Sequence, residues 1–304
     1  MIHVRRETEH HLAASLTALL GYRQARWRAV ILCGMAGIGK TALARASADD
    51  DQVIRAFRDG IAWVEGSRDP EEEVMRLCLG LSLERAPGER WHECWRRWSG
   101  AAERRLMLII DNAISAEDLP PLIAGLGPQV VVLITTQQGA EIRAEVERWL
   151  PADAIMEVGV HGLAPVEGRA LVEAVVGRSL ADGEWEPVQE IGEQVGWHPE
   201  ALRLTAIEGR EIGWRGMLGE LRAGRMPWDG VRRVIMKQWA RLHPEDQAQL
   251  MALVESKEPG VRFTTEEAAQ IWHAGAAIAA RWLRMLKSAG LVESIDSTEV
   301  PMQQ

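Results

Sequence analysis

The stretch Gly34-Met35-Ala36-Gly37-Ile38-Gly39-Lys40-Thr41 decides the fold of this 304-residue chain. It matches the pattern GxxxxGK[ST], in which glycines let the backbone of a loop approach a phosphate without Cβ clashes. An apolar run precedes it at residues 29–33, and a helical pattern follows it at residues 41–48. This is the strand–loop–helix context that the motif requires, so the stretch predicts a nucleotide phosphate site.

Each position of this loop has an expected role. Backbone N–H groups from Gly37 to Ala42 are expected to point at the phosphates, where the N-terminus of the following helix adds positive potential. Lys40 would place its charge on the β- and γ-phosphates, and the Thr41 hydroxyl would bind Mg²⁺. The residues expected to hold the nucleotide in this segment are Gly34, Gly37, Ile38, Gly39, Lys40, Thr41 and Ala42.

Further apolar runs predict a parallel sheet around the first one. They occupy residues 61–64, 106–110 and 130–134. Runs that are apolar on both faces and rich in β-branched residues are typical of buried parallel strands. Helical patterns separate them; Trp91, Trp95 and Trp98, for example, fall on one stripe of a helix. This alternation predicts a three-layer α/β domain of the P-loop NTPase kind.

The character of the sequence changes near residue 150. Residues 153–160 are compatible with one last strand, and helical patterns dominate after them. The last of these patterns precede a short strand-like piece at residues 291–295, an order that suggests a winged helix. We predict a P-loop nucleotide-binding domain at 1–154, a small helical domain at 155–225 and a winged-helix domain at 226–304.

The third apolar run ends in a carboxylate, Asp111. On a strand beside that of the glycine loop, this carboxylate would lie at the C-terminal edge of the sheet, where it can hold Mg²⁺. The alternative is an N-cap for the next helix, and the pairing with the loop favours the metal role. Thr41 and Asp111 are therefore the candidate Mg²⁺ ligands.

Asn112 stands where many P-loop ATPases carry a second carboxylate. An amide can orient a water molecule but cannot accept its proton, so the sequence supports binding more firmly than turnover. The candidate catalytic residues are Lys40, Asp111 and Asn112. After the fourth run, Gln137 is a candidate contact of the γ-phosphate, and a strand-end cap is the equally open alternative for this segment.

Composition and charge exclude several classes of protein. The chain has 35 basic and 44 acidic residues and a net charge of −9, which argues against coating nucleic acid or an anionic membrane. No window of about 18 residues is continuously apolar, so we expect no membrane span. Three cysteines without CxxC spacing (Cys33, Cys78 and Cys94), and no secretory h-region, favour a reduced cytoplasmic setting with the cysteines as core hydrophobes.

The predicted winged helix gives little support for DNA binding. Residues 214–241 carry an excess of basic side chains, but residues 242–304 carry an excess of acidic ones. Arg281, Arg284 and Lys287 are the positions that would face DNA on a recognition helix. We do not expect DNA contact from so weak a pattern.

Several stretches together resemble the NB-ARC proteins, the STAND-class signalling ATPases. The loop and the Ala42-Leu43-Ala44 that follows it are similar to the P-loop of the family. Leu108–Ala113 is similar to the Walker B form of its bacterial antibiotic-regulator-like members. Other similar elements, in the family's order, are Val4–Glu7 at the N-terminus, Phe57–Val64 at the second strand and Gly196–Leu202 at the GLPLAL motif. The resemblance covers essentially the whole chain.

The resemblance implies a nucleotide-dependent switch. Members of this family bind ADP tightly in a closed, inactive state, and exchange for ATP opens them and drives assembly into a homo-oligomer. Effector or sensor modules would lie outside this chain. Carried over by position, Lys40, Thr41 and Asp111 take the phosphate and Mg²⁺ roles, while Pro199, with Val4 and Arg6, would border the adenine and ribose.

Three departures from the family pattern shape the functional prediction. Asn112 replaces the second acid, and Gln137 stands where an arginine is common. The family's winged-helix histidine is not found after the last strand-like piece, so the chain is either a fragment or a reduced member. We therefore expect an ADP- or ATP-binding switch with slow or absent hydrolysis. The alternatives are an active AAA+-like ATPase and a winged-helix DNA-binding regulator with an ATPase module.

Overall fold

The computed structural model describes most of the chain up to residue 222 and a short part beyond it. The described residues are 6–19, 27–66, 69–222 and 264–272, with the single positions 248, 252, 279 and 283. The chain divides into two compact units, Met1–Leu171 and Val172–Gln304. Each unit is described by itself below.

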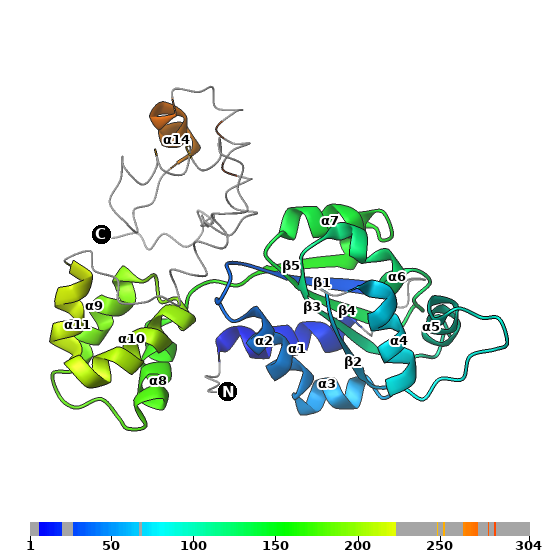
Figure 1. The fold of residues 1–304 in the computed structure, drawn as a ribbon, viewed down its shortest axis with the longest axis horizontal. Coiled ribbons are helices and arrows are strands. Elements are labelled where there is room, and N and C mark those ends of the chain that lie inside the picture. The colour runs from blue at the N-terminus through cyan, green and yellow to red at the C-terminus, as the bar shows by residue number, and fades with distance from the viewer. Residues whose placement is uncertain are drawn as a thin grey trace. The chain divides into compact units, whose positions relative to one another are not determined.

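The first unit is built on a five-stranded parallel sheet (Figure 1). Its strands are β1 (Arg28–Cys33), β2 (Ile61–Glu65), β3 (Met107–Ala113), β4 (Val131–Thr136) and β5 (Ile155–Gly159). The order across the sheet is β2-β3-β4-β1-β5, so β1 lies between β4 and β5. All of the strands that the apolar runs predict are confirmed. Because every strand is parallel, the polar residues that follow them collect at one edge.

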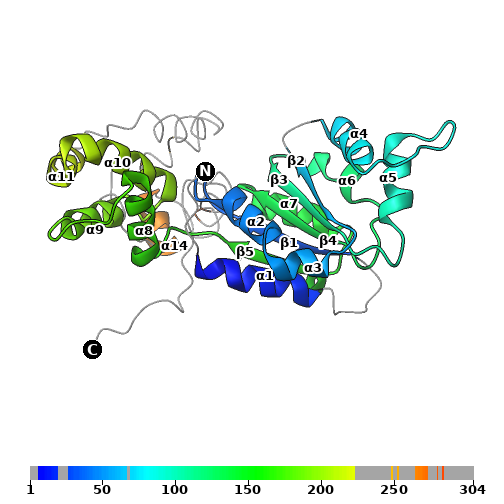
Figure 2. The same cartoon turned by 90° about the horizontal axis from the view of Figure 1, so that it is seen from below.

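Helices cover both faces of this sheet, which makes three layers (Figure 2). On one face pack α1 (Glu7–Leu19), α2 (Lys40–Ala48) and α3 (Asp51–Ala56). On the other face pack α4 (Pro70–Gly80), α5 (Trp91–Ser99), α6 (Pro120–Ile123) and α7 (Gly139–Glu147). Strand residues alternate between the two layers: Ile109 belongs to the core under α1–α3, and Ile110 to the core under α4–α7. The predicted three-layer α/β domain is confirmed.

Short connections complete the first unit, and helices form the described part of the second. The connections are the 3₁₀ turns η1 (Ala116–Asp118) and η2 (Ala152–Ala154). The helices are α8 (Pro165–Val176), which spans the boundary between the units, α9 (Trp185–Gln194), α10 (Pro199–Ile212), α11 (Trp214–Arg222) and α14 (Thr265–Ile271). The helical part that the sequence predicts after the sheet is confirmed. The predicted winged helix lies outside the described residues, except for α14.

Glycines let two tryptophans pack tightly within the second unit. A Cβ at Gly192 would lie 2.5 Å from the Trp197 ring, and one at Gly209 would lie 2.6 Å from the Trp214 ring. The Trp214 indole donates a hydrogen bond of 3.0 Å to Glu184.

None of the helices in the described part of the chain combines the length and the apolar character that a membrane crossing needs.

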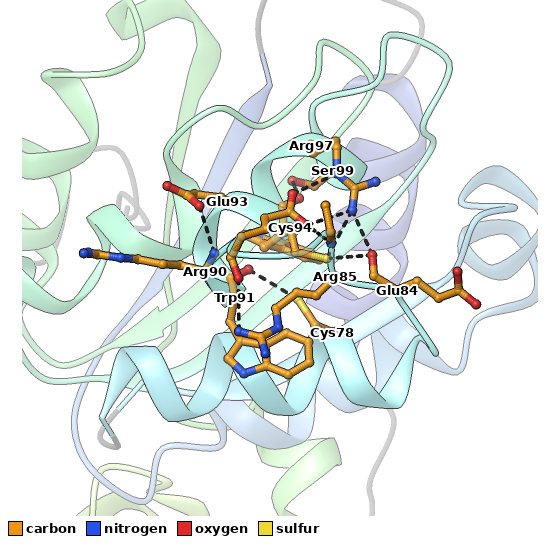
Figure 3. A network of polar contacts seen from close by, with 12 residues as sticks. Cys78, Glu84, Arg85, Arg90, Trp91, Glu93, Cys94, Arg97 and Ser99 are labelled. Atoms are coloured by element: carbon orange, nitrogen blue, oxygen red, sulfur yellow. Dashed lines mark hydrogen bonds and ion pairs between the residues drawn. The ribbon is translucent and has the colours of Figure 1, made fainter.

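A polar network covers the buried residues at which α4 and α5 pack together (Figure 3). Arg97 donates to the Glu84 carbonyl at 2.9 Å, and the Arg85 guanidinium lies 4.5 Å from the centroid of the Trp91 ring. Beneath these contacts, Cys78 and Cys94 are fully buried, and burial raises the pKa of the Cys78 thiol to about 12. The two cysteines therefore behave as the small core hydrophobes that the sequence predicts.

Trp95 anchors α5 to the sheet. Its side chain is fully buried, and its Nε1 donates a hydrogen bond of 2.8 Å to the Leu122 carbonyl. Removing the ring leaves a large cavity and an unpaired carbonyl, so we expect Trp95→Ala to lower the free energy of unfolding by about 3–5 kcal/mol. Urea denaturation measures the loss. The exposed Arg55→Ala on α3 is the control, with a change within about 0.5 kcal/mol; equal effects of the two would contradict this account of the core.

Candidate nucleotide-binding site

The glycine loop connects the end of β1 to the start of α2, and it requires Gly34 for a close backbone approach and Gly39 for a left-handed backbone. A Cβ at Gly34 would lie 2.5 Å from the Val160 carbonyl oxygen. Val160 in turn donates its N–H to the Cys33 carbonyl at 2.7 Å, so the chain leaving β5 closes against the loop. Gly39 has a φ of 102°, which side chains rarely allow. The loop conformation therefore depends on its glycines.

The side chain of Lys40 contacts the backbone of the glycine loop and does not extend into solvent. Its Nζ donates hydrogen bonds of 2.8 Å to the carbonyls of Gly34 and Met35, and its side chain is buried. Burial lowers the pKa of Lys40 to about 8, against the opposing effect of the nearby Cys33 and Asp111. The ammonium is therefore held where the motif expects phosphate oxygens, and an added negative charge there would favour its protonated form.

Asp111 joins three elements through one oxygen. Its Oδ1 accepts a hydrogen bond of 2.9 Å from the Thr41 hydroxyl on α2 and one of 2.5 Å from the Thr135 hydroxyl on β4. The carboxylate is 4% exposed. It does not cap the next helical turn, because the Ser115 hydroxyl accepts from Glu117 N–H there. Thr41 and Asp111, the predicted Mg²⁺ pair, are thus brought together across α2 and β3.

This donor set fits a magnesium ion that completes its shell with phosphate oxygens and water. Mg²⁺ binds oxygen ligands and usually takes only one or two from carboxylates of the protein. Among the residues that the structure describes, no group of three or more His, Cys, Asp or Glu side chains is placed to hold a metal ion. The Mg²⁺ role of Thr41 and Asp111 stays a prediction.

Asn112 occupies a kink at the edge of the sheet. The pairing of β3 with β4 is irregular between Ile110 and Ala113, and Asn112 has a φ of 59°, in the left-handed region that asparagine tolerates. Its N–H donates to the Thr135 hydroxyl at 2.8 Å, and its side-chain amide donates to Glu65 Oε1 at 3.3 Å.

Sequence reasoning missed Glu65 and the role of Thr135. Glu65 is the last residue of β2, and Asp111 on β3 is its partner in the register of the sheet. A carboxylate after the second apolar run is the signal that could have found Glu65. No comparable signal in the sequence marks Thr135, whose hydroxyl meets Asp111 across two neighbouring strands.

Thr136, the last residue of β4, has the hydrogen bonds of a strand-end cap, which is one of the two interpretations of this segment. The Thr136 hydroxyl donates to the Ala113 carbonyl at 2.7 Å and accepts from the Gln138 N–H at 2.9 Å. Gln137 is half-buried between β4 and α7. Contact of Gln137 with a γ-phosphate stays a prediction.

Arg6 lies on the backbone of the glycine loop. Its guanidinium donates to the Ile38 carbonyl at 2.7 Å, and a Cβ at Gly39 would lie 2.6 Å from Arg6 Nη2. Burial lowers the pKa of Arg6, opposed by the charges of Glu167 and Glu9. Its predicted contact with adenine or ribose is not tested by this geometry.

Two further residues, Val4 and Pro199, are predicted to border the adenine. Val4 lies outside the described residues. Pro199 is the first residue of α10 in the second unit, where His198 Nδ1 accepts from the Ala201 N–H at 3.3 Å. The adenine contacts of both residues stay predictions.

A glycine loop between the first strand and a helix, with a carboxylate at the end of β3, defines a P-loop nucleotide-binding module. Residues 9–140 match the model of the NB-ARC domain, and this part of the chain is an NB-ARC domain. The family resemblance read from the sequence is therefore confirmed over these residues.

Regulators of actinobacteria are among the proteins similar to this chain. The regulatory protein AfsR of Streptomyces coelicolor is 28% identical over 183 residues, which are 58% of this chain and 17% of AfsR. A Mycobacterium tuberculosis protein whose name places it among HTH-type transcriptional regulators is 25% identical over 191 residues, 61% of this chain and 20% of that protein. The chain thus spans about a fifth of the length of these curated relatives.

The fold is also found among solved structures. A Walker-type ATPase of Pyrococcus abyssi superposes with a TM-score of 0.61 at 14% identity, over 97% of this chain and 92% of that one. At this identity the likeness concerns the fold alone. It agrees with a P-loop fold in which a helical part follows the parallel sheet.

We expect the buried Lys40 to make nucleotide binding depend on pH. The pKa of Lys40 is about 8, and a bound phosphate raises it, so above pH 8 binding must take up a proton. We expect ADP affinity to be constant below that pH and to fall as the pH rises, by at most about tenfold per unit. Calorimetry at about pH 7 and about pH 9, in buffers of different ionisation enthalpy, measures the proton uptake; a flat affinity with no uptake would contradict it.

We expect the Thr41–Asp111 pair to make affinity for ATP depend on Mg²⁺. We expect Asp111→Asn to reduce the gain in ATP affinity that Mg²⁺ gives by about tenfold or more, because the amide cannot supply the negative charge. Titrations with Mg²⁺ and with a chelator measure the gain. Asp153→Asn, an exposed change on η2, is the matched control, and an undiminished gain in Asp111→Asn would exclude the metal role.

Proposed function

We propose that this chain is an adenine-nucleotide switch. It binds ADP or ATP with Mg²⁺ at the glycine loop, hydrolyses ATP slowly, and signals through the exchange of one nucleotide for the other. One observation carries the proposal: the buried Lys40 ammonium and the Thr41–Asp111 pair lie at the same edge of the sheet, on β1–α2 and β3. The NB-ARC match over residues 9–140 supports it.

The residues of the loop supply binding and charge neutralisation. Lys40 would exchange its two carbonyl partners for oxygens of the β- and γ-phosphates. Backbone N–H groups at the start of α2 would donate to the remaining phosphate oxygens. When bound, Mg²⁺ neutralises phosphate charge, and Thr41 and Asp111 would hold it.

Two residues at this edge lack groups that assist ATP hydrolysis in faster enzymes. Asn112 cannot act as a base, and Gln137 cannot stabilise the charge of a γ-phosphate as an arginine can. Both changes favour long-lived nucleotide states, which suit a switch better than a motor. Nucleotide exchange would then control domain rearrangement and self-association into a homo-oligomer, with effector or sensor parts supplied outside this chain.

A regulator of transcription is the second candidate. It is favoured by the similarity to regulators of Streptomyces and Mycobacterium, over about a fifth of their length. In that case the nucleotide state of this module would control a DNA-binding part. The basic residues Arg281, Arg284 and Lys287, which could contact DNA, lie outside the described residues.

Loss of the Lys40 ammonium tests the proposed function. We expect Lys40→Met to weaken ADP binding by about 100-fold or more, because the charge-assisted contact to the β-phosphate is lost. Fluorescence titration with a labelled ADP measures it, and thermal unfolding checks that the variant is folded. Arg55→Ala on the neighbouring helix is the control. Unchanged ADP affinity in a folded Lys40→Met protein would refute the site.

A further inference from the structure

Glu65 faces the same layer of the molecule as the Mg²⁺ pair. Trp63, two residues earlier on β2, packs into the core under α1–α3, and the Arg45 guanidinium of α2 lies 5.5 Å from its ring centroid. Because side chains alternate along a strand, Glu65 leaves β2 on this same face. Asp111 follows Ile109 of the same core by two residues, so it too faces α2.

The backbone around Glu65 is fixed against β3. Glu65 and Asp111 are register partners, and Gly66 donates its N–H to the Asp111 carbonyl at 2.7 Å. A Cβ at Gly66 would lie 2.9 Å from the Ala113 Cα, so the two chains approach closely directly after Glu65. On the other side, the Glu65 N–H donates to the buried Glu73 carboxylate at 3.2 Å. The carboxylate of Glu65 is thus carried by a rigid strand end.

The side chain of Asn112 contacts the carboxylate of Glu65 and does not replace it. Asn112 Nδ2 lies 3.3 Å from Glu65 Oε1, within hydrogen-bond distance. The φ of 59° at Asn112 suits asparagine and glycine, whereas a glutamate there would adopt a strained backbone. The residue after Asp111 therefore donates a hydrogen bond to a neighbouring carboxylate and does not itself provide a carboxylate.

We propose that Glu65 is the general base for ATP hydrolysis at this site, positioned by Asn112. This inference rests on the proposed nucleotide site and assigns the proton acceptor that the strand of Asp111 does not provide. A water molecule attacks the γ-phosphorus, and the bond from that phosphorus to the β–γ bridging oxygen breaks. Glu65 takes the proton of the water, ADP and inorganic phosphate leave, and the proton passes to solvent.

The isosteric change Glu65→Gln separates hydrolysis from binding. Glutamine still accepts from Asn112 but cannot take a proton, so we expect phosphate release in single turnover, with protein in excess, to slow by about 100-fold or more. The dissociation constants for ADP and ATP should stay within about twofold. After incubation with ATP and Mg²⁺, the variant should retain ATP where the unaltered protein holds ADP, as chromatography of the released nucleotide shows.

Glu117→Gln is the matched control, because Glu117 is an exposed carboxylate that follows the same strand as Asp111 on η1. We expect it to hydrolyse ATP at the unaltered rate. Hydrolysis by Glu65→Gln at the unaltered rate would overturn the proposal, as would ATP binding by the unaltered protein without any hydrolysis. Failure of the unaltered protein to bind nucleotide would instead refute the proposed function itself.

The positioning role of Asn112 has its own test. Asn112→Gly keeps the left-handed backbone and removes the amide. We expect the hydrolysis rate constant to fall by about tenfold with the ATP dissociation constant unchanged, and no further fall when the change is added to Glu65→Gln. A rise in rate, or an independent further loss in the double variant, would show that Asn112 does not act through Glu65.

Discussion

One carboxylate oxygen holds the functional edge of this protein together. Asp111 Oδ1 accepts hydrogen bonds from Thr41 on α2 and Thr135 on β4, so a single buried charge joins β3, its neighbouring strand and the helix that follows the glycine loop. A buried anion needs such donors, since leaving it short of one costs about 1–3 kcal/mol or more. The same Thr135 hydroxyl accepts from the Asn112 N–H, which fixes the kink after Asp111. The geometry at the end of the loop and beside the candidate base therefore depends on the hydrogen bonds around the Asp111 carboxylate.

The order of the strands explains why the chemistry gathers there. With all five strands parallel and β4 placed between β1 and β3, the ends of β1, β3 and β4 lie together, and β2 adds its own end beside β3. Positive charge comes from Lys40 at the start of α2, after β1, and negative charge from Asp111 and Glu65 in the last residues of β3 and β2. This division suits a site that neutralises phosphates on one side and places oxygen ligands and water on the other.

Much of this arrangement could be predicted from the sequence, because its signals are local. Each buried strand is a continuous apolar run, and the GxxxxGK[ST] stretch identifies the loop and the helix after it. The contacts across strands were less accessible. Glu65 is one acidic residue after a short strand, and only the register with Asp111 and the left-handed Asn112 give it meaning. Likewise, nothing near Thr135 in the sequence shows that its hydroxyl meets Asp111. Such pairings depend on the alignment of distant segments, which periodicity alone does not set.

The nucleotide carried by the purified chain tests the central claim most directly. The protein would be purified without added nucleotide, denatured, and the released small molecules separated by ion-exchange chromatography. The account predicts stoichiometric ADP, held at a loop where Lys40 and the hydrogen-bonded Thr41 and Asp111 are already in place. Release of no adenine nucleotide, together with failure of the purified protein to take up added ADP and Mg²⁺, would contradict it.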